Sequence, residues 1–553
     1  MKAIDPANVL PCEILAAIFI QLTQRECLEC MAVSRHWYST LPSCVHGVFS
    51  SMVLRGRHDY THNNTFRQCL GSHVRKVTIE SCNNSDILFG ITTILETYGC
   101  RQLESLELLR CSVDARILSF IQSISTQLQH LLLTDCYLWC DSFTFIRYMI
   151  SICPTSLVSL SVDRGRQQFS IPATTTTSTI TPTTTTTTTT TITTITNSAI
   201  ETLHLSDVYS LPELFAILDH CPKLTQLSVD TTHQFHPAIL PYCSRLTHFR
   251  WCMGARPWIH SSSSMQQQDD DAPKEKSLYG LDIEAKDLEL FMQRSFQHLR
   301  FLGLHSVRYL GQRAMLLRIL EQAQPTLNHA YLGLNPSTAE GGVLNALHRL
   351  HCLQSLHMTL ELNEPWHDRI LPLLHGIQDI AHASSHTMES IALDVPFPIL
   401  KDLDDKADVL VSMGLIPFLK KVRMDVSNVQ ETSLLAFLER ADELRDLTIE
   451  SVKPIFSYRL LSAIASAMPH LRHFKISYCP QIEAAGIRRL ADHHHHHNQQ
   501  GLSLTFVCCQ FDDNGACVQY AKEKLGKANV IYTLDEDDDY VFGAYPNIQP
   551  PDP

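Results

Sequence analysis

A six-residue pattern of apolar positions, L-x-x-L-x-L with conservative replacements, recurs through most of the chain. The alternating second and third apolar residues place two side chains on one face of a short strand, and the first packs under the turn that precedes it. Most copies begin roughly 22 to 35 residues apart. Weaker copies lie at Val74, Leu278 and Leu504. Thirteen clear copies begin at Leu103, Leu128, Leu157, Ile200, Leu224, Leu246, Leu299, Leu327, Leu353, Met388, Leu419, Leu444 and Leu471.

Between the expected strands the apolar spacing changes to that of a helix. Leu211, Leu214, Phe215 and Leu218 follow the i, i+3, i+4, i+7 pattern of a core-facing helix. Proline then ends several of these helices shortly before the next strand, because it cannot continue a helix. These prolines are Pro154, Pro222, Pro325, Pro417 and Pro469. A single copy could be an ordinary buried strand, but thirteen copies predict a repeated strand, turn and helix.

The repeated unit resembles a leucine-rich repeat. Several copies carry Cys three residues after the last apolar position, where that family uses Asn or Cys to hold the turn. They are Cys82, Cys111, Cys136 and Cys479. The resemblance implies an α/β repeat fold, a curved solenoid with parallel strands on the concave face and helices outside. We expect it over residues 71–532, with disordered insertions at 172–198 (almost pure Thr) and 260–276.

Two further segments differ from the repeat. His493–His497 is a run of five histidines inside the last repeat unit, and we predict a solvated loop there. Residues 533–553 form an acidic C-terminal tail, in which Asp535–Asp539 reads DEDDD.

The N-terminal forty residues show no copy of the repeated pattern and have helical spacing instead. Pro11 suits the first turn of a helix, and Ile14, Ile18 and Leu22 then form an apolar stripe at i, i+4 and i+8. Thr23 with Glu26 makes a capping box that opens a second helix. Ser34 can cap a third helix, which carries Trp37. Three short helices form a core at or below the size that is stable alone, so this unit should depend on a partner.

This stretch resembles an F-box. The matching residues are Leu10, Pro11, Glu13, Ile14, Leu15, Ile18, Phe19, Val33, Ser34, Arg35, Trp37 and Tyr38. The family often opens its second helix with Asp-Leu, where this chain has Glu26-Cys27-Leu28. The resemblance implies a three-helix module, at residues 5–45, that docks on the Skp-type adaptor of Skp–cullin–F-box ubiquitin ligases. A helical link at 46–70 would join it to the repeats.

By that resemblance, one set of residues would supply the adaptor-binding surface: Leu10, Pro11, Glu13, Ile14, Ile18, Leu22, Val33 and Trp37. Trp37 would mainly brace the helices. The alternative is a helical cap on the N-terminal end of the solenoid, since repeat arrays need caps. The two predictions differ in one observable. The stripe is open to solvent in an adaptor-binding module, and it is folded against Val74, Val77 and Ile79 in a cap.

Composition limits the classes of function. The chain has 553 residues, with 44 basic and 57 acidic side chains and a formal net charge of −13. Without a long Lys/Arg run, this balance argues against general binding to nucleic acid or acidic membranes. No 18 apolar residues run together, and the N-terminus lacks a secretory pattern. We therefore expect the 19 cysteines to be thiols in a reducing compartment, cytoplasmic and/or nuclear.

No motif predicts catalysis or a cofactor. Cys27-x-x-Cys30 is the only CxxC, and a zinc site would need a second pair. Phosphate-binding, nucleophile-elbow and zinc-protease motifs are missing from the sequence. The two resemblances together imply a non-catalytic substrate-recognition subunit of a Skp–cullin–F-box E3 ubiquitin ligase. Its partners would be the adaptor, through it cullin, and a target protein destined for proteasomal degradation. The alternative is a leucine-rich-repeat scaffold outside any ligase.

We predict the target-binding surface from the strand position between the second and third apolar residues. This row reads Glu107, Leu132, Ser161, His204, Ser228, Arg250, Gly303, Tyr331, His357, Ala392, Arg423, Thr448 and Lys475. Its mixed chemistry suits protein recognition, with Arg250, Tyr331 and His357 as candidate contacts. Near its end, a basic patch could bind an acidic or phosphorylated segment, unless it is merely a solvated face. The residues of this patch are Lys421, Arg423, His473 and Lys475.

Overall fold

The computed structural model describes the ordered repeats and the N-terminal helices. It covers residues 9–55, 67–163, 198–208, 210–231, 237–253, 296–307, 310–334, 342–360, 370–394, 419–426, 431–450, 456–497 and 501–533. The predicted insertions at 172–198 (apart from Ser198) and 260–276, and the tail beyond Thr533, lie outside these residues. The chain divides into two compact units, Met1–Leu246 with Met253–Asp270, and Thr247–Cys252 with Asp271–Pro553.

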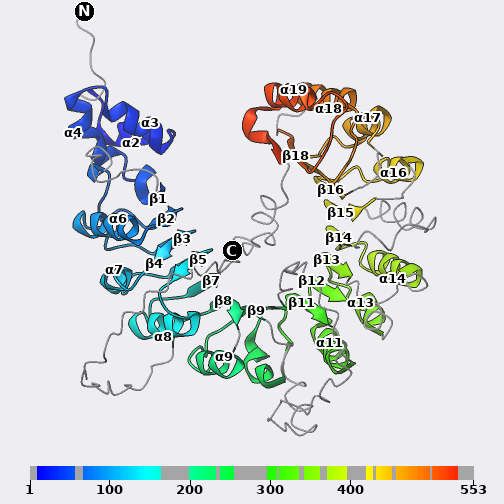
Figure 1. Cartoon of the computed structure of the whole chain (residues 1–553), viewed down its shortest axis with the longest axis horizontal. Coiled ribbons are helices and arrows are strands. Elements are labelled where there is room, and N and C mark those ends of the chain that lie inside the picture. Colours follow the sequence, from blue (N-terminus) through cyan, green and yellow to red (C-terminus); the bar gives the residue numbers. More distant parts are fainter. Residues whose placement is uncertain are drawn as a thin grey trace, which may run out of the picture. The chain divides into compact units, whose positions relative to one another are not determined.

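Three short helices begin the first unit (Figure 1): α2 (Cys12–Phe19), α3 (Gln24–Met31) and α4 (Arg35–Cys44). The predicted caps are confirmed. The backbone N–H of Thr23 donates to the Glu26 carboxylate at 2.7 Å, and the Glu26 N–H donates to the Thr23 hydroxyl at 3.3 Å. The Ser34 hydroxyl accepts from the N–H of Trp37 at 3.2 Å and opens α4. Helices α3 and α4 therefore start at side chains that accept a backbone hydrogen bond. Helix α2 starts after Pro11, which has no backbone N–H to donate.

Seven parallel strands follow in the first unit, each paired with the next along the chain: β1 (Ser51–Arg55), β2 (Lys76–Glu80), β3 (Ser105–Leu109), β5 (His130–Thr134), β7 (Ser159–Asp163), β8 (Thr202–Val208) and β9 (Gln226–Thr231). Helical segments connect and follow them: η1 (Val48–Ser50), α6 (Ser85–Thr97), α7 (Ile117–Ile124), α8 (Ser142–Ile152), α9 (Leu211–Leu218) and η2 (Pro237–Arg245). Two short strands, β4 (Ser112–Val113) and β6 (Tyr137–Leu138), pair beside the main sheet.

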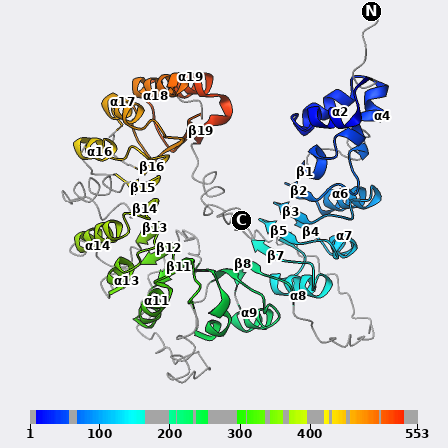
Figure 2. The ribbon, with the colours of Figure 1, turned by 180° about the vertical axis from the view of Figure 1, so that it is seen from behind.

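The second unit repeats this plan with ten described parallel strands: β10 (His248–Met253), β11 (Phe301–Val307), β12 (His329–Leu334), β13 (Ser355–Leu360), β14 (Ser390–Asp394), β15 (Lys421–Asp425), β16 (Asp446–Glu450), β17 (His473–Ser477), β18 (Ser503–Val507) and β19 (Val530–Thr533). Its helices are α11 (Leu310–Ala323), α13 (Leu344–His348), α14 (Ile370–Ala383), α16 (Glu431–Leu438), α17 (Tyr458–Ala467), α18 (Ala484–His497), α19 (Ala516–Leu525) and η5 (Lys527–Asn529). Within each unit the helices cover one side of the strands (Figure 2).

The repeated apolar pattern is the core, as predicted. Among the side chains that the structure describes, every apolar position of the thirteen clear copies is buried. Leu444, Leu447 and Ile449 of β16 illustrate the arrangement, with at most 1% of each exposed. Parallel strands require such crossover helices, so each strand and helix of one repeat packs on the next.

The turn after several strands has a common geometry, in which a left-handed residue precedes the cysteine. Arg110 has a φ of 55° and donates its N–H to the carbonyl of Thr134 at 2.8 Å. The next residue, Cys111, donates its thiol to the carbonyl of Ile79 at 3.3 Å. Cys136 makes the equivalent contact to Leu108 at 3.1 Å. The cysteines thus hold the turn against the preceding strand.

The predicted helical link at 46–70 is wrong for Ser51–Arg55, which form strand β1. β1 pairs in register with β2, so Val53 lies opposite Thr78. Met52 and Leu54 are buried and their neighbours are exposed. Phe49, Met52 and Leu54 carry the apolar pattern and are buried, so this copy was overlooked in the sequence, and pairing with β2 supplies the hydrogen bonds of the strand.

The predicted solvated loop at His493–His497 is also wrong, because this run continues helix α18. Ile487, Leu490 and Ala491 are buried, and His494 lies one helical step further on the same face. Only 2% of His494 is exposed. No helix in the described part of the chain has the length and apolar content to cross a bilayer.

Candidate functional site

Helix α2 carries apolar side chains on two faces, and only one face is buried. Leu15 and Phe19 pack in the core of the three helices. Ile14 and Ile18 are 49% and 47% exposed, and Val33 after α3 is 69% exposed. One turn separates Ile14 from Ile18, so the two isoleucines lie side by side along the helix. The N-terminal helices therefore present an exposed apolar surface.

The other predicted adaptor-binding residues are exposed or partly exposed. Pro11 and Glu13 are exposed at the start of α2, and Leu10 and Leu22 are partly exposed at its two ends. Trp37 is partly exposed and packs edge-on against Phe19, with 6.2 Å between the ring centroids. That contact agrees with the predicted bracing role of Trp37.

The helices are attached to the first strands by contacts that leave this apolar surface open. Gln24 donates its side-chain amide to the carbonyl of Val48 at 3.0 Å. The His46 and His73 rings stack with centroids 4.1 Å apart. Cys69 donates its thiol to the Met31 sulfur at 3.5 Å. These contacts join the N-terminal helices to the segments on either side of β1.

The cysteines of the second helix are packing groups. Burial raises the pKa of Cys27 to about 11, and burial followed by the charge of Glu26 raises the pKa of Cys30. These thiols stay protonated at neutral pH, which disfavours metal binding or nucleophilic attack. Among the residues that the structure describes, no three His, Cys, Asp or Glu side chains are grouped to hold a metal ion.

The predicted target-binding row is aligned in each unit by the parallel register. In the first unit it runs Val53, Thr78, Glu107, Leu132, Ser161, His204 and Ser228. In the second it runs Arg250, Gly303, Tyr331, His357, Ala392, Arg423, Thr448, Lys475, Thr505 and Ile531. The predicted row did not include Val53, Thr78, Thr505 and Ile531. The strands of Thr505 and Ile531 lack the first apolar position of the pattern, whereas Val53 and Thr78 lie in copies that were overlooked or counted as weak.

Ring side chains gather on strands β10 to β13. The Tyr331 and His357 rings have centroids 3.8 Å apart, so two predicted contact residues meet. In the neighbouring row, Phe301 lies between His248 at 6.0 Å and His329 at 6.5 Å, three residues that the sequence did not single out. Burial lowers the pKa of both histidines. His248 and His329 are therefore largely neutral at pH 7.

The predicted basic patch faces carboxylates on β16. Lys421 lies 2.9 Å from Asp446, and His473 lies 3.9 Å from the same carboxylate. The Arg423 guanidinium lies 2.9 Å from Glu450. The positive charge of Lys421 and Arg423 is thus largely compensated, because the register brings β16 carboxylates beside them.

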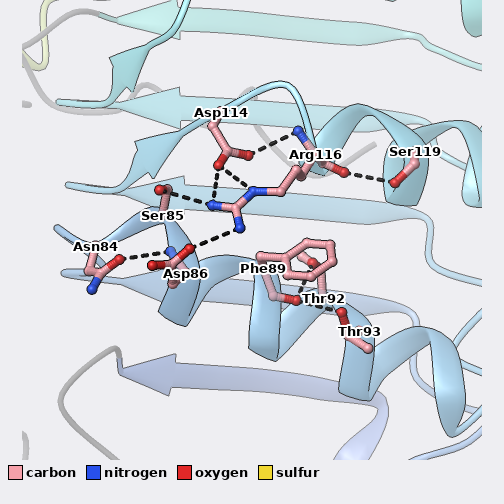
Figure 3. A network of polar contacts seen from close by, with 9 residues as sticks. All are labelled: Asn84, Ser85, Asp86, Phe89, Thr92, Thr93, Asp114, Arg116 and Ser119. Atoms are coloured by element: carbon pink, nitrogen blue, oxygen red, sulfur yellow. Dashed lines mark hydrogen bonds and ion pairs between the residues drawn. The ribbon is translucent and has the colours of Figure 1, made fainter.

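A polar network links two consecutive repeats of the first unit (Figure 3). The Arg116 side chain lies 2.9 Å from Asp86 at the start of α6, and it donates to Asp114 at 2.6 Å and to Ser85 at 3.1 Å. Its guanidinium carbon lies 4.9 Å from the centroid of the Phe89 ring. Asp114, then Asp86, raise the pKa of Arg116. This network fixes α6 to the following turn and is structural.

Comparison with known proteins supports the N-terminal assignment. The model of the F-box-like family matches residues 7–42, which contain α2, α3 and most of α4. No curated protein matched the chain. A solved structure, the crystal structure of the Rad7 and Elc1 complex in yeast, is similar with 13% identity and a TM-score of 0.38, over 71% of this chain and 79% of that chain. A TM-score this low supports no argument about this chain.

Proposed function

We propose that this chain is the substrate-recognition subunit of a Skp–cullin–F-box E3 ubiquitin ligase. Its N-terminal helices bind a Skp-type adaptor and, through it, cullin. Its repeats are leucine-rich repeats that hold a target protein for ubiquitin-dependent proteasomal degradation. The chain is not itself catalytic: it raises the effective concentration of the target near the conjugating machinery. We place this function in the cytoplasm and/or nucleus.

The observation that carries the proposal is the exposure of Ile14, Ile18 and Val33 within the F-box-like match. Exposed apolar side chains that adjoin one another are typical of interaction sites. Fully burying such a side chain contributes about 1.5–3 kcal/mol. A helical cap, the alternative, would turn the stripe onto the repeats, yet Val77 and Ile79 are buried in the sheet while the stripe stays open.

The test is binding of a Skp-type adaptor to the wild-type chain and to Ile14→Asp/Ile18→Asp. Both positions lie on the solvent side of α2, so the variant should fold. In the complex each carboxylate would be buried without a partner, and we expect affinity to fall at least about 100-fold. Isothermal titration calorimetry measures the loss, and circular dichroism checks folding.

The matched control is Ile87→Asp/Ile531→Asp, which places the same charges at isoleucines of similar exposure away from the N-terminal helices. This control should bind the adaptor as the wild type does. If the wild-type chain binds no adaptor, the ligase proposal fails. The chain is then a repeat scaffold.

A further inference from the structure

Three cations form a line immediately before strands β15, β16 and β17. Lys420, Arg445 and Arg472 occupy the same position in consecutive repeats. Arg445 donates its backbone N–H to the Lys420 carbonyl at 2.8 Å, and Arg472 donates to the Arg445 carbonyl at 2.7 Å. Neighbouring strands lie about 4.8 Å apart, so the three residues span roughly 10 Å.

The two arginines differ from the cations that the sequence singled out. Arg445 and Arg472 are partly exposed, and neither guanidinium makes a hydrogen bond or ion pair within the described part of the chain. By contrast, Lys421 and Arg423 each have a carboxylate at 2.9 Å. Lys420 lies 2.7 Å from Glu389, in a surface ion pair of the kind that contributes little and can exchange partners.

This end of the second unit is locally basic in an acidic chain. Over β15–β17 and the residue before each strand, six basic side chains face three acidic ones, a formal charge of +3, whereas the whole chain carries −13. The basic residues are Lys420, Lys421, Arg423, Arg445, Arg472 and Lys475. The acidic residues are Asp425, Asp446 and Glu450.

In the first unit, the basic residue at the equivalent position, Arg75, has a carboxylate partner. Arg75, immediately before β2, lies 3.3 Å from Glu104, immediately before β3. Lys76 lies 2.6 Å from Glu107. At the position before the strand, Arg75 of the first unit has a carboxylate partner, as Lys420 has in the second, whereas the guanidinium groups of Arg445 and Arg472 have none among the described residues.

We propose that Arg445 and Arg472, with Lys420 beside them, bind an Asp/Glu-rich segment of the target protein. The inference rests on the proposed function, because the protein that carries this acidic segment is the target that the ligase recruits. Guanidinium groups pair bidentately with carboxylates. Alternate side chains of an extended peptide lie about 6.7 Å apart, so a segment crossing the strand starts presents successive carboxylates to this line.

The test measures binding of a fluorescein-labelled peptide, Asp-Glu-Asp-Asp-Asp-Tyr, to the full-length chain by fluorescence anisotropy. Its amide analogue, Asn-Gln-Asn-Asn-Asn-Tyr, should not bind. Arg445→Glu/Arg472→Glu should weaken binding of the acidic peptide at least about 10-fold, since each reversal replaces an attraction by a repulsion. Binding should also weaken as salt rises.

The control variant is Arg440→Glu/Arg489→Glu, which makes the same change of charge at exposed arginines outside the strands. It should retain binding. Equal loss in both variants, or no loss in Arg445→Glu/Arg472→Glu, overturns the proposal. So does a chain that binds only a phosphoserine peptide and not the Asp/Glu peptide.

The chain's own acidic run, Asp535–Asp539, could compete with the peptide, so the titration is repeated with these five residues changed to the corresponding amides. Tighter binding by that variant supports the site, and no binding by either chain overturns it. Adaptor binding is measured on the same samples. If the wild-type chain binds the adaptor but not the acidic peptide, this inference alone is rejected. If the wild-type chain binds the peptide but not the adaptor, the proposed function alone is rejected.

Discussion

The N-terminal helices and the repeats differ in how far they bury their apolar side chains. In α2, Ile14 and Ile18 remain about half exposed beside the buried Leu15 and Phe19. In the repeats, the apolar positions of each strand are buried between the sheet and its helices, as Leu447 shows. The first region offers apolar area to a partner. The second completes its own core with the repeated pattern, and its exposed apolar side chains, such as Ile87 and Ile531, lie outside that pattern.

Size explains the difference. The three helices have 8, 8 and 10 residues, and so small a group can bury only one face of each helix. A repeat always has a neighbour on which to pack. We infer that adaptor binding depends on apolar contact, and that target selection depends on the pattern of charges and rings along the strands.

The largest expected contrast is between two truncations to alanine. Leu447→Ala leaves a cavity in the core of the second unit, and we expect a loss of about 2–5 kcal/mol in the free energy of unfolding. Ile18→Ala removes a half-exposed side chain and should change stability by less than about 0.5 kcal/mol. Urea denaturation followed by circular dichroism measures both. An equally large loss for Ile18→Ala would mean that the stripe is covered, and the comparison would fail.

The second prediction concerns pH and the buried His494. Burial, then the neighbouring His493, lowers the pKa of His494 to about 4, from an ordinary value of 6.5. Above pH 6.5 both folded and unfolded states are neutral at this residue. Between pH 6.5 and 4 only the unfolded state takes up the proton, so stability falls by up to about 3 kcal/mol.

Urea denaturation at several pH values tests this, with His494→Gln expected to flatten the dependence. His495→Gln, at an exposed histidine in the same helix, is the control and should retain it. An unchanged profile for His494→Gln would show that the acid sensitivity has another source. If stability falls with pH as expected, the N-terminal helices and the repeats differ in acid sensitivity too, because the complete burial that stabilises the repeats would also make them sensitive to acid.

The smallest expected effect concerns the third N-terminal helix. Ser34→Ala removes the acceptor for the N–H of Trp37, and we expect the module to lose about 1 kcal/mol. Ser39→Ala, at an exposed residue of the same helix, removes a hydroxyl that donates to the carbonyl of His36, and should be close to neutral. Thermal unfolding and adaptor affinity are the measurements. If Ser34→Ala lowers adaptor affinity without lowering stability, Ser34 contributes to the binding surface directly.

Features that were predictable from the sequence depend on residues close together in the chain. The capping box of Thr23 and Glu26 joins residues one helical turn apart, and the repeated apolar pattern fixes each strand within six residues. Strand β1 was missed although Phe49, Met52 and Leu54 carry the pattern locally. The ion pairs were missed because they depend on neighbours distant in the chain, as the carboxylate of Asp446 lies on the next strand, 2.9 Å from Lys421.

The sequence by itself therefore determined the three capped helices, the strand-and-helix repeat and the identity of the core, because local spacing decides which side chains share a face. Only the tertiary structure decided which side chains remain exposed or unpaired and can therefore contact a partner. It left Ile18 exposed, buried His494, paired Arg423 with Glu450 and left the guanidinium groups of Arg445 and Arg472 unengaged within the described residues. The physical reason is that burial and ion pairing are set by the register between repeats, which aligns residues roughly 25 positions apart.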